Sequence, residues 1–374
     1  MFDYEQVRIQ RGARSGFPII AAIHSTALGP AIGGCRLWRY PDWRDGLTDA
    51  LRLAKGMTLK NAAARLAHGG GKTVIALPPG TVLDGAARRD VLLDVGEVVE
   101  SFAGQYATGP DVGTSTEDMG VIGEVTKQVF CRPEPLGGSG DPAAYTAAGV
   151  RAAINAVCRL LDAPGSGTGN PVSGGSGVSG VSGVSGVSGT VRGRTVTVIG
   201  LGHVGAHLAR ELARDGAQLL VTDIDESRRG VAAEIGATWC EPGAALTAEA
   251  DLLVPAALGG QLTAEVVPAL HCRAIVGPAN NQLADDGVAR LLHERGIRWV
   301  PDYLASAGGV TYAVARELHG AGLDEARHQV LGIGAVTEEL LRTADRLGTD
   351  PHQAALDRVH EQLAVHEQLA SASS

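Results

Sequence analysis

The sequence predicts two α/β domains, and three observations support this fold class. The chain has 374 residues, which is enough for two domains with separate cores. Short apolar, β-branched runs alternate with stretches of helical periodicity along most of its length. A tract of Ser, Gly and Val interrupts this alternation. C-terminal to the tract, predicted strands and helices alternate regularly. That regularity predicts a parallel, doubly wound sheet in the second domain.

The first domain is predicted from residues 1–141. Its apolar residues recur at strand or helix spacing in successive segments. The predicted elements are a strand at 17–23, a helix at 46–63, a strand at 72–77, a helix at 90–102 and a helix within 112–129. A further helix at 146–161, rich in Ala and Val, leads into the second domain.

The tract at 173–189 consists almost entirely of Ser, Gly and Val. Glycine loses much conformational entropy on ordering, and the tract has no apolar periodicity to offset that loss. We therefore predict a flexible surface loop at 165–190 without a role in the chemistry.

The second domain is predicted from residues 142–350. Short apolar runs predict its strands at 195–199, 218–222, 252–254, 274–276 and 297–300. Two final helices are predicted at 325–347 and 351–369, and the segment 351–374 is expected to complete the first domain.

A glycine fingerprint follows the first strand of the second domain. Gly200, Gly202 and Gly205, with His203 and Val204 between the last two, form a G-x-G-x-x-G sequence at the start of a predicted helix. In this context the glycines permit a tight turn and close approach of a pyrophosphate to the helix N-terminus. Asp223 lies at the end of the next strand, where a carboxylate binds a ribose 2′-hydroxyl.

The position of Asp223 favours NAD over NADP, because a carboxylate there repels a 2′-phosphate. Arg228 and Arg229 follow closely and leave NADP open as an alternative. A glycine turn without a ligand is the remaining interpretation of the fingerprint.

Two lysines lie beside a glycine run in the first domain. Lys72 follows Gly69–Gly71 at the start of a predicted buried strand, and Lys60 precedes it by twelve residues. A buried lysine loses its proton more easily when a second cation is close. Lys60 is the expected second cation and a candidate partner for a substrate carboxylate. Asp111, on a predicted loop, is a candidate proton carrier, although each residue taken singly also fits an ordinary surface position or a turn.

The bulk composition narrows the classes of partner. The formal net charge of −9 argues against a nucleic acid or an anionic membrane surface. No segment has the pattern of a signal peptide or of a membrane span. The five cysteines are scattered without a C-x-x-C, so we expect a cytoplasmic protein without a metal site.

These motifs together resemble those of the glutamate/leucine/phenylalanine/valine dehydrogenase family, with the leucine and valine enzymes most similar. The resemblance follows the family's order over nearly the whole chain. Its segments are 28–34, 54–61, 69–73, 111–114, 138–141, the fingerprint at 200–205, 279–283, 301–303 and 307–310.

The resemblance implies a role for each matching residue. It assigns Lys60 to the substrate carboxylate, Lys72 to activation of water, and Asp111 to proton transfer at the amino nitrogen. Thr146 and Asn281 would contact the nicotinamide end or the substrate, with Asn280 beside them at the cofactor. It also implies a homo-oligomer, a cleft between the two domains and oxidation of an L-amino acid by NAD to a 2-oxo acid and ammonium.

The positions that match the family's side-chain pocket are Ile32, Gly33, Gly109, Phe130, Val310 and Ala313, and Met57 is a further substrate-binding candidate. Two of these positions, Phe130 and Ala313, depart from the residues usual in the family. Relatives usually carry a small polar residue at the position of Phe130 and a valine at that of Ala313. Because an apolar pocket discriminates one methylene by only about 1–3 kcal/mol, these changes are enough to alter which apolar amino acid is preferred.

Two alternatives to a branched-chain amino acid dehydrogenase stay open on the sequence. One is the same reaction on an aromatic amino acid such as phenylalanine. The other is a diverged protein that binds NAD or an amino acid with little turnover, an alternative suggested by Ser306, where the family usually has asparagine. Retention of Lys60, Lys72 and Asp111 together argues against the second.

Overall fold

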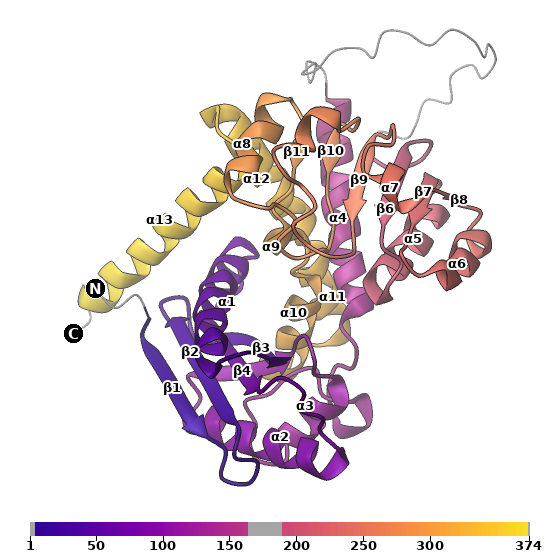
Figure 1. Cartoon of the computed structure of the whole chain (residues 1–374). Coiled ribbons are helices and arrows are strands. Elements are labelled where there is room, and N and C mark those ends of the chain that lie inside the picture. Colours follow the sequence, from indigo (N-terminus) through magenta and orange to yellow (C-terminus); the bar gives the residue numbers. More distant parts are fainter. Residues whose placement is uncertain (1–3, 164–188, 373–374) are drawn as a thin grey trace, which may run out of the picture. The chain divides into compact units, whose positions relative to one another are not determined.

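The computed structural model describes residues 4–163 and 189–372, which form two compact units (Figure 1). The first unit comprises Met1–Pro142, Val310–Arg327 and Asp357–Ser374, and the second comprises Ala143–Gly309 and His328–Leu356. This division differs from the predicted domain ranges because Val310–Arg327 packs with the first unit. The Ser/Gly/Val tract lies outside the described residues.

The first unit is built on a mixed five-stranded sheet of order β1-β2-β4-β3-β5. Its strands are β1 (Gln6–Arg11), β2 (Pro18–Ser25), β3 (Ala31–Arg39), β4 (Gly70–Leu77) and β5 (Tyr106–Pro110). β2 pairs antiparallel with β1 and β4, whereas β3 runs parallel to β4 and β5. The carboxyl ends of β3 and β5 therefore lie at the same edge of the sheet.

Helices cover both faces of this sheet, and the residues of β2 and β4 alternate between them. Ile20, Val74 and Ala76 pack with residues of α1 (Trp43–Ala63). Ile19, Ile75 and neighbouring apolar residues pack with α2 (Gly85–Glu100), beside α3 (Thr116–Ile122). Figure 1 shows α1 and α2 on opposite sides of β2 and β4. By this alternation, Lys72 belongs to the face that α1 covers.

The start of α1 is fixed by a capping box. The side chain of Asp42 accepts a hydrogen bond from the first turn, and the side chain of Asp45 accepts one from the backbone N–H of Asp42. Such a cap satisfies backbone donors that have no partner within the helix, and it contributes about 1 kcal/mol. The cap thereby fixes where α1 begins, and Met57 in its later turns borders Gly33 of β3.

The second unit contains a six-stranded sheet of order β11-β10-β9-β6-β7-β8. Its strands are β6 (Thr195–Ile199), β7 (Gln218–Thr222), β8 (Thr238–Trp239), β9 (Leu252–Pro255), β10 (Ala274–Ile275) and β11 (Arg298–Trp299). All of their pairings are parallel, which confirms the predicted sheet. The order reverses between β6 and β9, and ligands of such sheets bind outside the carboxyl ends of the strands at this reversal.

The helices of the second unit include α4 (Ala143–Asp162), which packs against α5 (His203–Arg214) and α12 (Ile333–Leu347). The other α-helices among the described residues are α6 (Arg229–Glu234), α7 (Pro242–Ala245), α8 (Gly287–Glu294), α9 (Asp302–Ala305), α10 (Gly308–Ala313), α11 (Leu323–Leu331) and α13 (Pro351–Ala372). A short π-helix, Val314–Leu318, follows α10.

One predicted helix, at 325–347, is wrong as a continuous element. The structure divides it into α11 and α12 at Gly332, a residue type that disfavours helix interiors. The predicted helix at 351–369 corresponds to α13. Within residues 4–163 and 189–372, no helix combines the length and the apolar character needed to cross a bilayer.

Candidate active site

Lys72 is a buried lysine in close contact with a carboxylate. It lies on β4 and is only 4% exposed. Its Nζ atom lies 2.6 Å from Oδ2 of Asp111. Because a buried charge is costly unless it is paired, this contact accounts for how the lysine is accommodated. The structure thus joins two residues that are 39 positions apart and that the sequence marks for proton chemistry.

Asp111 follows β5 directly, and several groups act on its carboxylate. Burial alone raises the pKa of this carboxyl group. The charges of Lys72 and Arg36, with hydrogen bonds from Lys72 and from the backbone of Val112, outweigh burial and hold the pKa below its usual range. Asp111 is therefore ionised at neutral and alkaline pH.

Arg36, on β3, is a site residue that the sequence did not reveal. Its Nε atom lies 3.0 Å from Oδ2 of Asp111, and its Nη1 atom lies 2.8 Å from Oδ2 of Asp49 on α1. The hydroxyl of Tyr40 donates a further hydrogen bond to the same oxygen of Asp49 at 2.8 Å. The available signal was an arginine on the β3 strand, two residues after the Gly33–Gly34 pair and on the face that α1 covers.

The last two turns of α1 carry Met57 and Lys60. A Cβ atom placed on Gly33 would lie 3.3 Å from Cγ of Met57, so this methionine borders the glycine pair of β3. Lys60 is half-buried in the last turn of α1. Its assignment to a substrate carboxylate stays a prediction, as does its action as a second cation near Lys72.

Four of the predicted pocket residues, Ile32, Phe130, Val310 and Ala313, belong to one apolar cluster, which we call the wall cluster. Its buried members are Ile32, Ala107, Phe130, Cys131, Ala313 and Val314, and the partly buried Leu66, Val310 and Leu318 pack against it. Ile32 precedes the Gly33–Gly34 pair, and Gly34 pairs with Gly109 across β3 and β5. Two members of the wall cluster, Ile32 and Ala107, therefore lie on β3, which carries Arg36, and on β5, which Asp111 follows.

The ring of Phe130 lies directly on the backbone of Gly109. A Cβ atom at Gly109 would approach Cε2 of Phe130 to 2.3 Å, so no larger residue fits there without moving the ring. Phe130 is 4% exposed, and its backbone N–H donates to the carbonyl of Thr108 at 2.9 Å. The large Phe130 is thus combined with small neighbours at Gly109 and Ala313, and their volumes compensate one another.

Glu317, in the π-helix, is a second residue that the sequence did not reveal. Its side chain is 2% exposed, and Oε1 accepts hydrogen bonds from the backbone N–H groups of Cys131 (2.6 Å) and Ser139 (2.9 Å). It also accepts one from the hydroxyl of Ser139 (2.6 Å), and its Oε2 contacts Nε of Arg132 at 3.2 Å. Glu317 thereby ties both ends of the loop after Phe130 to the segment that carries Ala313.

Replacement of Glu317 by glutamine is expected to destabilise the first unit. The glutamine amide has only one acceptor oxygen, and its NH2 group would face N–H donors that the second carboxylate oxygen now accepts. A buried polar group left unsatisfied in this way costs about 1–3 kcal/mol. Thermal unfolding of Glu317→Gln, compared with Glu124→Gln, measures this effect. Glu124 forms a half-exposed ion pair with Arg89, so its replacement is expected to leave the melting temperature nearly unchanged. Equal melting temperatures for both variants would contradict the role assigned to Glu317.

The glycine fingerprint occupies the turn between β6 and α5, as predicted. Gly200 has a φ of +104°, and a Cβ atom on Gly205 would lie 2.1 Å from the carbonyl oxygen of Gly200. A Cβ atom on Gly202 would meet nothing within 4 Å, and α5 begins after Gly202 without a side-chain cap. The first backbone N–H groups of α5, which include those of His203 and Val204, are thus suited to a pyrophosphate.

Asp223 lies at the carboxyl end of β7, beside this turn. Its Oδ2 atom accepts a hydrogen bond from the backbone N–H of Leu201 at 2.6 Å, and Oδ1 accepts one from Asp225 at 2.9 Å. The nearby basic residues are engaged with carboxylates. Arg229 contacts Glu226 (3.3 Å) and Glu241 (3.1 Å), and Arg228 lies 3.6 Å from Asp225.

Asn280 and Asn281 lie in a turn of the second unit, where Asn281 has a φ of +53°. The buried Gln282, which follows Asn281, anchors this turn. Its backbone N–H donates to Asp302 at 2.7 Å, and its side chain contacts Gly277 and Trp299. Thr146 lies in the first turn of α4, beside Gly308. Ser306 is 6% exposed and follows α9.

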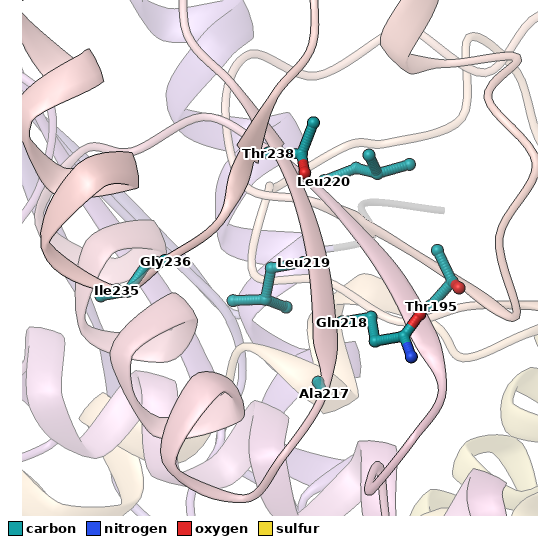
Figure 2. Close-up of a pocket in the computed structure, with 8 residues that line it drawn as sticks. All are labelled: Thr195, Ala217, Gln218, Leu219, Leu220, Ile235, Gly236 and Thr238. Carbon is teal, nitrogen blue, oxygen red and sulfur yellow. The ribbon is translucent and has the colours of Figure 1, made fainter. Parts of the chain in front are cut away.

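A hollow of about 430 Å³ in the second unit is distinct from the fingerprint (Figure 2). Thr195, Gln218 and Thr238 line it, and they are the first residues of β6, β7 and β8. The fingerprint and Asp223 lie at the opposite, carboxyl ends of β6 and β7. The hollow therefore does not belong to the predicted cofactor site. Among the described residues, no cluster of three or more His, Cys, Asp or Glu side chains has the geometry for a metal ion.

Comparison with known proteins identifies relatives along the whole chain. Residues 4–128 match the sequence family described as Glu/Leu/Phe/Val dehydrogenase, dimerisation domain, and residues 137–317 match the Glutamate/Leucine/Phenylalanine/Valine dehydrogenase family. A leucine dehydrogenase from Bacillus cereus is 38% identical over 96% of this chain and 91% of its own length. A valine dehydrogenase from Streptomyces albus is 37% identical over 96% and 92%.

Solved structures show the same architecture. The L-tryptophan dehydrogenase from Nostoc punctiforme superposes with a TM-score of 0.78 at 31% identity, over 98% of this chain and 97% of that one. A hetero-hexameric glutamate dehydrogenase from Thermus thermophilus superposes with a TM-score of 0.76 at 24% identity and supports the fold alone.

The three relatives reported above at more than 30% identity are amino-acid dehydrogenases, oxidoreductases that act on a CH–NH2 group. Their similarity extends through both units in the same order. The chain belongs to the Glu/Leu/Phe/Val dehydrogenase family.

Proposed function

We propose that this protein catalyses the reversible oxidative deamination of an L-amino acid with a branched aliphatic side chain, such as leucine or valine, with NAD as the hydride acceptor. The amino acid, water and NAD⁺ give the 2-oxo acid, ammonium, NADH and a proton. The buried contact of 2.6 Å between Lys72 and Asp111, beside the apolar wall cluster, carries this proposal. It combines proton-transfer groups with a surface for an apolar side chain.

In this proposal, different residues of the first unit bind different parts of the substrate. Lys60 binds the α-carboxylate, and the wall cluster with Met57 and Gly33 receives the side chain. Lys72 orients and deprotonates the water that attacks the imine carbon, and Asp111 carries protons to and from the amino nitrogen. The nicotinamide supplies the site that accepts the hydride from the α-carbon.

The turn at Gly200–Gly205 and the first turn of α5 suit the pyrophosphate, and Asp223 suits the ribose hydroxyls. Thr146, Asn280 and Asn281 are proposed to contact the nicotinamide end. The carboxylate partners of Arg228 and Arg229 support NAD over NADP, because these arginines are already engaged. The scattered free cysteines support a cytoplasmic setting, and the match to a dimerisation domain supports a homo-oligomer.

Replacement of Asp223 by serine is expected to reduce the preference for NAD over NADP by about tenfold or more, which corresponds to about 1.4 kcal/mol. The change removes a carboxylate that repels a 2′-phosphate. The ratio of kcat/KM for the two cofactors measures it, and Asp225→Ser is the matched control, because Asp225 caps the following turn. A ratio that falls equally in both variants would show a general disturbance of this turn.

The overall proposal is tested by product analysis. Purified protein with NAD and L-valine or L-leucine is expected to form ammonium, the 2-oxo acid and NADH in equal amounts. NADH without ammonium, or no NADH with either amino acid, would overturn the proposal.

A further inference from the structure

Arg36 bridges the predicted reaction centre and α1. We propose that Arg36 is a positioning residue, which holds the carboxylate of Asp111 beside Lys72 and couples it to Asp49. The expected effects on kcat and KM rest on the proposed function, whereas the expected effects on the protonation of the cluster do not. None of the sequence motifs singled out Arg36.

The two cations converge on one oxygen atom. Nζ of Lys72 and Nε of Arg36 lie 2.6 and 3.0 Å from Oδ2 of Asp111. A carboxylate held at one oxygen by two cations from different strands has little freedom to rotate. Its orientation toward a substrate nitrogen is thus set before the substrate binds, which is the condition for efficient proton transfer.

The other side of the guanidinium is anchored to α1. Nη1 of Arg36 lies 2.8 Å from Oδ2 of Asp49, and Oδ1 of Asp49 lies 2.7 Å from Nη2 of Arg52. Because the guanidinium is planar and has donors at fixed angles, contact with Asp49 fixes the direction of the Nε donor. Lysine in its place carries the charge but cannot make both contacts with the same geometry.

Burial makes this arrangement more than a surface ion pair. The side chains of Arg36, Asp49 and Asp111 are 20%, 16% and 23% exposed, and that of Lys72 is 6% exposed. Charges at this depth are screened little by solvent, so the loss of any one of them changes the proton affinity of the others.

Two neighbouring titratable groups, Tyr40 and Cys35, stay neutral in the working range. Burial, with a hydrogen bond to Asp49, raises the pKa of Tyr40. Burial raises the pKa of Cys35, beside Arg36 on β3, to about 12. Asp118 and Arg88 form their own ion pair. On α1, Arg52 contacts Asp49, and Lys60 lies further along the helix.

Variants with opposite charge changes test the proposal. Arg36→Met removes a cation, so the cluster is expected to hold its protons more tightly. Asp49→Asn removes an anion bonded to Arg36, so the cluster is expected to release protons more easily. Arg36→Lys keeps the charge and is expected to restore part of the wild-type behaviour.

The first readout does not require turnover. Brief acetylation with acetic anhydride at graded pH, followed by peptide mass spectrometry, gives the pH at which Lys72 is half-modified relative to the exposed Lys127. We expect this midpoint to rise by about one pH unit in Arg36→Met and to fall in Asp49→Asn, since buried neighbouring charges shift protonation by this order.

The second readout is the pH dependence of kcat/KM with the best amino acid. Its acid limb is expected to move in the same directions, with kcat reduced about tenfold or more in Arg36→Met, the lower end of the effect of proton-transfer groups. Midpoints that stay at the wild-type pH, or that move in the same direction in both variants while the melting temperatures fall, would overturn the proposal. If the acetylation midpoints shift as expected in the variants but the wild-type protein shows no turnover, only the proposed function is overturned.

Discussion

Replacement of Lys72 by alanine is expected to abolish turnover while leaving the affinity for NAD largely intact. Lys72 is the buried amine in contact with Asp111, and it belongs to the first unit, whereas the fingerprint belongs to the second. Loss of a positioned proton-transfer group lowers a rate by about 10²–10⁴-fold. The measurement is kcat for NADH formation together with NAD binding by calorimetry.

Lys55→Ala is the matched control for this experiment. Lys55 lies on the exposed side of α1, so its loss is expected to change neither rate nor affinity. If Lys72→Ala lost NAD affinity and turnover to the same degree, Lys72 would have a structural role and the proposed mechanism would be wrong.

Replacement of Phe130 by leucine is expected to shift the substrate preference toward larger side chains. The ring of Phe130 fills the space above Gly109 and lies in the wall cluster with Ile32 and Ala313. Leucine keeps the site apolar but vacates the outer part of the ring. The ratio of kcat/KM for phenylalanine to that for valine is expected to rise about tenfold or more, within the range of about 10–200-fold that apolar pockets provide.

Phe102→Leu separates this effect from a general loss of stability. Phe102 is 1% exposed and lies in the other core of the same unit, against α2. Both variants lose a similar amount of buried ring, so their melting temperatures are expected to fall alike. An unchanged preference in Phe130→Leu, or an equal change in Phe102→Leu, would show that Phe130 does not form the side-chain pocket.

The sequence predicted the second sheet well because local signals define it. Five of its six strands were predicted from short, mainly apolar runs, the two-residue β8 was missed, and the fingerprint marks the turn after β6. The first sheet was harder to predict. β3 contains Gly33 and Gly34, and β5 ends in Gly109 and Pro110, residue types that are depleted in strands. Their pairing is decided by long-range contacts.

The same limit applies to the site. Lys72 and Asp111 were predicted because each lies in a distinctive motif. Arg36 and Glu317 were not, because their roles follow from partners that are 75 and 186 residues away in the sequence. A charged residue on a strand or helix gives no local signal of such a partner. The compensation between Phe130 and Gly109 likewise became visible only when the structure placed the ring on the glycine.

The substrate ranking of the purified protein tests the assignment to branched-chain amino acids most directly. Initial rates of NADH formation are measured at alkaline pH with NAD and a panel of L-amino acids that includes valine, leucine, phenylalanine and tryptophan. We expect the highest kcat/KM for a branched aliphatic amino acid. If kcat/KM is highest for phenylalanine or tryptophan, the assignment to aliphatic substrates is contradicted. If no amino acid gives NADH, the proposed dehydrogenase activity is contradicted.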